Sequence, residues 1–198
     1  MFLQPPPASP ATERFYQGDR DDQGYVANFS RLWARRPEVF TEFAALRMRL
    51  TDASSLSPRD LGVLVCATAA SLGDSYCALA WGKRLAEAAD PATAAAVLSG
   101  AAGAVVTARD RALAVWARKV ARDPNSTTRA DVDRLRGAGL SEQEIFEATV
   151  FVGFRLAFSS VNDALGLRPD RQLAAAVPAQ VRDAVTFGRP VAQAESTA

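Results

Sequence analysis

The spacing of apolar residues predicts helices from residue 28 onward. Pro37 suits the first position of a helix, because its fixed φ matches the helix and its missing N–H would be unpaired there anyway. The residues that follow place apolar side chains along one side of that helix, namely Val39, Phe40, Phe43, Leu46 and Leu50. No segment alternates apolar and polar residues for long enough to predict a strand, and the nearest candidate, residues 100–106, is short and glycine-rich. The pattern favours an all-α fold.

One start signal recurs at the expected helix N-termini. A serine or threonine stands three residues before an acid, so that each side chain can pair with the backbone N–H of the other residue. The pairs are Ser57 with Asp60, Thr107 with Asp110, Thr128 with Asp131, and Ser141 with Glu144. Asp90 followed by Pro91 predicts a further cap. The repeated signal strengthens the prediction of an all-helical protein.

Two segments, residues 61–72 and 145–158, are apolar nearly all round. Helices of this kind are buried in a core or in a subunit interface. Because the chain has more apolar helix surface than a small monomer hides, we expect a homo-oligomer. Segment 145–158 is too short for a membrane span and carries Glu147 and Arg155. Arg155 needs a partner there, and an ion pair with a protein acid is favoured over a substrate carboxylate.

We expect one domain with two short ends. A chain of 198 residues that is 48% apolar can bury one core. Residues 1–24 are rich in proline, glycine and charge, which predicts an irregular arm, either a frayed terminus or an arm lying across a neighbouring subunit. The helical domain is expected over residues 25–190, and residues 191–198 read as a polar tail.

The amino-acid composition argues against several classes of partner and site. With 23 Lys plus Arg against 22 Asp plus Glu, the chain has no field that would attract nucleic acid or an anionic membrane. It has no histidine and two cysteines, so we expect no metal site, and no motif indicates a cofactor. No long uncharged apolar run predicts a membrane span, and the first residues lack a basic region followed by an apolar one. We therefore expect a cytoplasmic protein with reduced thiols.

The segment from Gly62 to Gly82 contains the candidate reactive group. The pattern predicts that one helix ends near Gly73 and that a second begins at Asp74, which would cap it. Cys77 is then the third residue of the second helix, where the helix dipole favours a thiolate and the Asp74 charge opposes it. The simpler interpretations are a helix cap for Asp74 and a small core residue for Cys77.

Residues 57–60, Ser-Pro-Arg-Asp, and 72–82, Leu-Gly-Asp-Ser-Tyr-Cys-Ala-Leu-Ala-Trp-Gly, resemble the AhpD-like alkylhydroperoxidase and carboxymuconolactone decarboxylase family. The likeness extends more loosely over residues 25–190 and implies an AhpD-like helical bundle that forms dimers, trimers or hexamers. The family's peroxidase branch uses a Glu, a Cys-x-x-Cys pair and a His. These positions correspond here to Gly62, Asp74, Cys77 and Trp81, so that three of the four groups are missing.

Three further residues are candidates for this site. Cys66 lies four residues after Gly62, on the same side of its helix, which suggests that the second thiol has moved from position 74 to 66; core packing is the alternative. Trp81 replaces the family's His with an indole that can donate one hydrogen bond and moves no proton at neutral pH. Tyr76 can donate a hydrogen bond to a ligand or fill the core.

Three functions remain open. The first is a thiol-dependent peroxidase, an antioxidant oxidoreductase that acts on a small molecule through Cys77, alone or with Cys66, with an external thiol as reductant. The second is a lyase or isomerase on a small carboxylated substrate, as in the decarboxylase branch, using Asp74 as acid or base and Arg155 as anion holder. The third is a non-catalytic member of the family.

Overall fold

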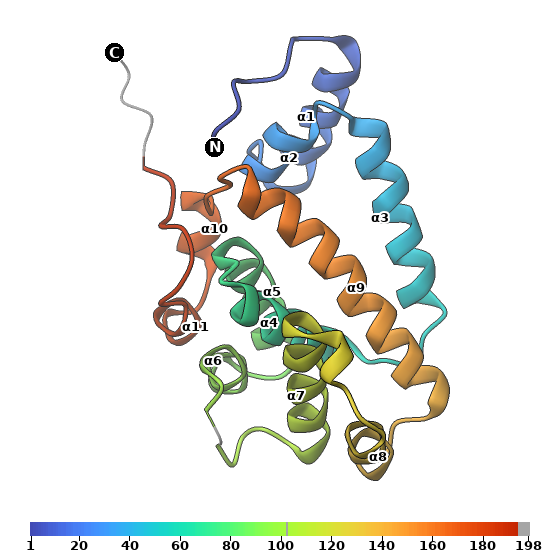
Figure 1. Cartoon of the computed structure of the whole chain (residues 1–198). Helices are drawn as coiled ribbons and strands as arrows, with labels where there is room; N and C mark the ends of the chain where they lie inside the picture. The colour runs from blue at the N-terminus through green and yellow to red at the C-terminus, as the bar shows by residue number, and fades with distance from the viewer. Residues whose placement is uncertain (102, 194–198) are drawn as a thin grey trace.

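The computed structural model describes residues 1–101 and 103–193, and within them the chain is helical and contains no strand. The all-α prediction is confirmed. Figure 1 shows the elements in order: α1 (Pro10–Gln23), α2 (Asn28–Trp33), α3 (Pro37–Asp52), α4 (Pro58–Leu72), α5 (Ser75–Ala88), α6 (Pro91–Ser99), α7 (Ala108–Arg122), η1 (Pro124–Ser126), α8 (Arg129–Gly137), α9 (Glu142–Ala164), α10 (Arg171–Ala176) and α11 (Ala179–Ala184).

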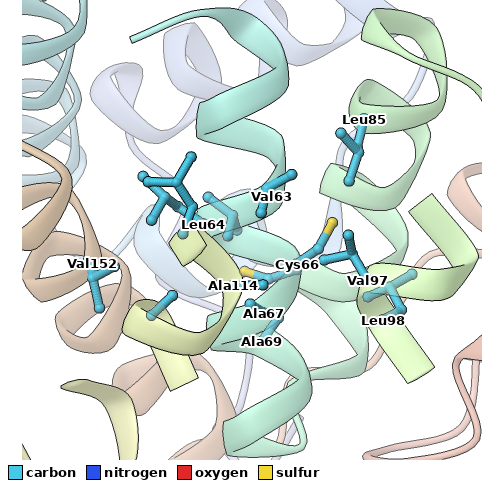
Figure 2. Packing of buried hydrophobic residues seen from close by; sticks show 14 of the residues in the cluster. Val63, Leu64, Cys66, Ala67, Ala69, Leu85, Val97, Leu98, Ala114 and Val152 are labelled. Carbon is cyan, nitrogen blue, oxygen red and sulfur yellow. The ribbon is translucent and has the colours of Figure 1, made fainter. Parts of the chain in front are cut away.

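Helix α4 is the centre of the core. It packs against α5, α6, α7 and α9, which explains why its sequence is apolar nearly all round. In Figure 2, Val63, Leu64 and Cys66 of α4 lie among aliphatic side chains of these neighbours, such as Val97 of α6. Helix α9 contains the apolar segment 145–158 and begins after the predicted cap at Ser141. No helix in the described ranges is both long and apolar enough to cross a bilayer.

The predicted helix starts are confirmed. Capping boxes form at Ser57, Thr107, Thr128 and Ser141, and Asp90 caps α6. Gly73 ends α4 with a φ of 75°, a left-handed conformation that glycine adopts without strain, and Asp74 caps α5. The chain therefore turns back sharply at residue 73, as predicted.

The capping boxes of α4 and α7 are joined by two ion pairs, in which an arginine of each helix binds the capping acid of the other. Arg59 donates to the Asp110 carboxylate at 2.6 Å, and Arg109 donates to the Asp60 carboxylate at 2.9 Å. Arg109 also pairs with Glu144 of α9 at 2.8 Å. Each acid thus serves both the cap of its own helix and an ion pair to a neighbour, so that the starts of three helices are held together.

The N-terminal segment differs from its prediction. Residues 10–23 form α1, so the expectation of an irregular arm is wrong for them. The Ser9 side chain accepts the Thr12 N–H, and Pro10 supplies the first helical position. A local start signal therefore outweighs the proline-rich composition. Of the predicted tail, the residues after 193 lie outside the described part of the chain.

Helix α3 is only partly covered by the rest of the protein. It has no fully buried residue, and Val39 and Leu46 on its predicted apolar side are 40% and 50% exposed. This apolar surface agrees with the expectation of a homo-oligomer, which stays a prediction.

Two glycines in helices give opposite expectations for stability. At Gly82 in α5, a Cβ would lie 2.5 Å from Cγ1 of Val181, whereas at Gly153 in α9 it would meet nothing within 4 Å. Gly82→Ala should therefore destabilise the fold by about 1–3 kcal/mol through overpacking. Gly153→Ala should stabilise it by up to about 1 kcal/mol, since alanine favours the helix. Urea unfolding of both variants measures this, and shifts of the same sign would contradict it.

Candidate functional site

A cavity of about 130 Å³ lies between α2, α3, α5 and α9. Its lining is mostly aromatic, with three arginines and one thiol: Phe29, Phe40, Phe43, Ala44, Arg47, Tyr76, Cys77, Ala80, Trp81, Arg84, Arg155 and Phe158. No carboxylate belongs to the lining. The cavity therefore combines apolar walls with an excess of positive charge.

Helical spacing explains how these side chains converge. The lining residues of α3, and those of α5 apart from Tyr76, each stand at intervals of three, one and three residues, which places them on one side of their helix. They are Phe40, Phe43, Ala44 and Arg47 on α3, and Cys77, Ala80, Trp81 and Arg84 on α5. On α9, Arg155 and Phe158 have the same relation. Because α3 lies alongside α9 (Figure 1), the three sides face one space.

Cys77 places a thiol in the cavity lining. Its side chain is 2% exposed, and Nη2 of Arg155 donates a hydrogen bond to its Sγ at 2.8 Å. The Ser159 hydroxyl donates to the same sulfur at 3.8 Å. Burial raises the pKa of Cys77 to about 12; Arg155 opposes this shift and Asp74 adds to it. At neutral pH the sulfur is therefore a thiol, with a cation in place to stabilise its thiolate.

Arg155 has no acidic partner in the described part of the chain. It is 5% exposed, no ion pair to it exists among the described residues, and its Nε lacks a hydrogen-bond partner there. Instead its guanidinium carbon lies 4.9 Å from the ring centre of Phe158 and 5.5 Å from that of Trp81. The expected ion pair with a protein acid is therefore wrong, since the sulfur and two aromatic faces surround this cation.

Asp74 lies behind Cys77 and not in the cavity lining. It is fully buried, and its Oδ1 accepts the Cys77 N–H at 2.9 Å, which is the cap that the sequence predicts. Its Oδ2 has no hydrogen-bond partner in the described residues. Burial, followed by the charge of Asp74, raises the pKa of nearby Asp163 to about 7, against the opposing effect of Arg189. The charge of Asp74 therefore acts on Asp163 of α9.

Cys66 is not brought to the cavity. It is fully buried in the aliphatic core, as Figure 2 shows, and it does not belong to the cavity lining. Both cysteines are free thiols, and burial raises the pKa of Cys66 above its ordinary value. The position corresponding to the family's Glu is filled as well, since a Cβ on Gly62 would lie 3.0 Å from Cβ of Leu85.

Tyr76 and Trp81 both line the cavity with their rings. The Tyr76 hydroxyl donates to Oδ2 of Asp170 at 2.6 Å, so its one donor is not available to a ligand. The Trp81 ring stacks beneath Arg84, whose guanidinium carbon lies 4.8 Å from the ring centre. Both residues therefore shape the cavity, and Trp81 also positions two of its cations.

Sequence reasoning missed Arg47, Arg84 and the phenylalanines of the cavity. A signal existed within each helix, because Arg84 follows Cys77 by two helical turns and so lies on its side of α5. Nothing local indicated that α3 would face α5. Within the described ranges, no three Cys, Asp or Glu side chains are grouped as a metal site would require.

Comparison with known proteins identifies the fold. No protein-family model and no curated protein matches the sequence. Among solved structures, the AhpD core of an uncharacterised peroxidase-related protein from Ralstonia eutropha JMP134 has a TM-score of 0.76 at 23% identity, over 87% of this chain and 93% of that one. An uncharacterised peroxidase-related protein from Silicibacter sp. TM1040 gives 0.75 at 22% identity, over 86% and 92%.

A third protein with this fold is named for a different activity. The debrominase Bmp8 has a TM-score of 0.73 at 14% identity, over 93% of this chain and 98% of that one. A cysteine-to-alanine variant of Bmp8 was solved with 2,3,4-tribromopyrrole bound. At these identities the likeness establishes an AhpD-like fold, which confirms the fold that the sequence resemblance implied.

Proposed function

We propose that this protein is a thiol-dependent peroxidase in which Cys77 reduces a small hydroperoxide. The observation that carries the proposal is the hydrogen bond from Arg155 to the Cys77 sulfur inside a cavity lined with aromatic rings. A guanidinium has donors only, so this contact favours the thiolate, which is the nucleophilic form. The peroxidase-related proteins that share the fold support the same chemical class.

The reaction follows from the groups in place. The Cys77 thiolate attacks the terminal oxygen of ROOH, so that an S–O bond forms, the O–O bond breaks and an alkoxide leaves. Arg155, 2.8 Å from the sulfur, stabilises first the thiolate and then the alkoxide. The proton lost by the thiol ends on the alkoxide, and the products are ROH and a Cys77 sulfenic acid.

An external thiol completes the cycle, since the structure does not place Cys66 beside Cys77. One R′SH condenses with the sulfenic acid, which releases water and forms a mixed disulfide. A second R′SH then displaces the Cys77 thiolate and leaves as R′SSR′. The sum is ROOH plus two R′SH giving ROH, water and R′SSR′.

Cumene hydroperoxide tests this proposal. The two cysteines provide matched variants, because both are buried and only Cys77 lines the cavity. Wild type and Cys66→Ser should each lose one free thiol at similar rates, with a sulfenic acid trapped by dimedone, whereas Cys77→Ser should react at least about 100-fold more slowly. Thiol counts in denaturant and peptide mass spectrometry measure this. Equal rates in Cys77→Ser and wild type would refute the role of Cys77.

The cavity also fits a second reaction, reductive removal of a halogen from a small aromatic ring. The favouring observation is a ring-lined space beside a thiol, together with the shared fold of the debrominase Bmp8. With an external thiol, ArBr plus two R′SH gives ArH, HBr and R′SSR′. Bromide release from 2,3,4-tribromopyrrole that depends on Cys77, without oxidation of Cys77 by hydroperoxides, would favour this reaction. A lyase using Asp74 has less support, because its carboxylate does not line the cavity.

A further inference from the structure

Three arginines share the cavity, and no acid belongs to its lining. Arg47, Arg84 and Arg155 all belong to its lining, and no described carboxylate lies within ion-pair distance of any of them. Burial, and then the charge of Arg155, lowers the pKa of both Arg47 and Arg84. Three like charges in so small a space repel one another, and an anion in the cavity would relieve that repulsion.

The three cations are not equivalent. Arg155 is nearly fully buried and tied to the Cys77 sulfur. Arg47 is half-buried and Arg84 is exposed, so these two lie nearer the open end of the cavity. Neither makes a hydrogen bond to another described side chain, although Arg84 is held over the Trp81 ring. Arg47 and Arg84 therefore have donors available for a ligand.

We propose that Arg47 and Arg84 bind the carboxylate of a small substrate whose flat apolar body lies on the aromatic walls beside Cys77. This names the substrate class of the proposed peroxidase and rests on that function for the reaction itself. A guanidinium fork matches the two oxygens of a carboxylate. The cavity of about 130 Å³ is close to the ~150 Å³ that holds a benzene ring in an apolar protein cavity. A benzoate-sized acid fits both features.

Binding of benzoate tests the proposal without any turnover. The measurement is made by calorimetry in Cys77→Ser protein, with benzamide as the neutral isostere. Benzoate should bind at least about tenfold more tightly than benzamide. Arg47→Gln and Arg84→Gln should each reduce that preference at least about fivefold. Arg129→Gln, which removes an exposed arginine outside the cavity, should leave it unchanged.

The outcomes are separable from those of the peroxidase assay. Equal binding of benzoate and benzamide, or equal effects of Arg47→Gln and Arg129→Gln, would overturn the proposal. Competition by inorganic phosphate as strong as that by benzoate would also overturn it, because the site would then select any oxyanion. A preference for benzoate in Cys77→Ser would support the site even if hydroperoxides failed to oxidise Cys77. Oxidation of Cys77 without that preference would leave the peroxidase intact and this proposal refuted.

Discussion

Arg155→Met is expected to raise the pKa of the Cys77 thiol further above its ordinary value and to slow its alkylation by iodoacetamide at least about tenfold. Burial raises this pKa to about 12, and Arg155 is the largest opposing influence. Loss of a hydrogen bond from a charged donor to a buried anion costs about 1.5–3 kcal/mol, and about 1.4 kcal/mol corresponds to one decade in thiolate. Methionine keeps the apolar stem against Trp81 and Phe158, so packing should survive.

The pH profile distinguishes this effect from general damage. Well below a pKa of about 12, the alkylation rate of wild type should rise about tenfold per pH unit, because only the thiolate reacts. In Arg155→Met the profile should shift to higher pH, whereas in Arg84→Gln it should move little, since Arg84 does not contact the sulfur. Both are measured in a Cys66→Ala background, so that one thiol is followed. An unshifted profile in Arg155→Met would show that the 2.8 Å contact does not control the thiol.

The helices were predictable because their signals are local. Asp74 and Gly73 define a turn through their own backbone preferences, and the sequence alone placed both correctly. The same approach failed at residues 1–24, where composition indicated an irregular arm while a short cap at Ser9 starts a helix. Local signals thus decide where helices begin even when the average composition points elsewhere.

The site was only partly predictable, because its contacts join distant helices. Cys77 and Arg155 are 78 residues apart, and no local pattern indicates that one donates to the other. An ion pair was expected for Arg155 because a buried charge without a partner is costly. In the structure two aromatic faces and the Cys77 sulfur stabilise this charge instead. Cys66 shares a helix side with Gly62, yet that side faces the core at Leu85 and Val97. Spacing identifies one side of a helix and not what that side faces.

Arg109→Leu is expected to destabilise the protein by about 3 kcal/mol at neutral pH. Arg109 pairs with Asp60 and Glu144, and its loss would leave both acids, Asp60 nearly fully buried, without that cation. Breaking a buried pair from one side costs about 3–5 kcal/mol, and partial exposure of Arg109 places the expected value at the lower end. Arg20→Leu, which breaks an exposed pair with Glu13, should cost less than about 1 kcal/mol. Urea unfolding at one pH compares the two.

The pH dependence of this cost has a definite sign. The pKa of Glu144 falls from 4.5 to about 2, mainly because its carboxylate accepts the Ser141 backbone N–H. Burial opposes this shift, and the hydrogen bond from Arg109 adds to it. A group whose folded pKa is depressed stabilises the fold above its unfolded pKa and loses that contribution as the pH falls through the folded value. The difference between wild type and Arg109→Leu should therefore shrink from about pH 4.5 down to about pH 2. A difference that stayed constant over this range would mean that Arg109 stabilises the helix starts through packing of its stem and not through its charge.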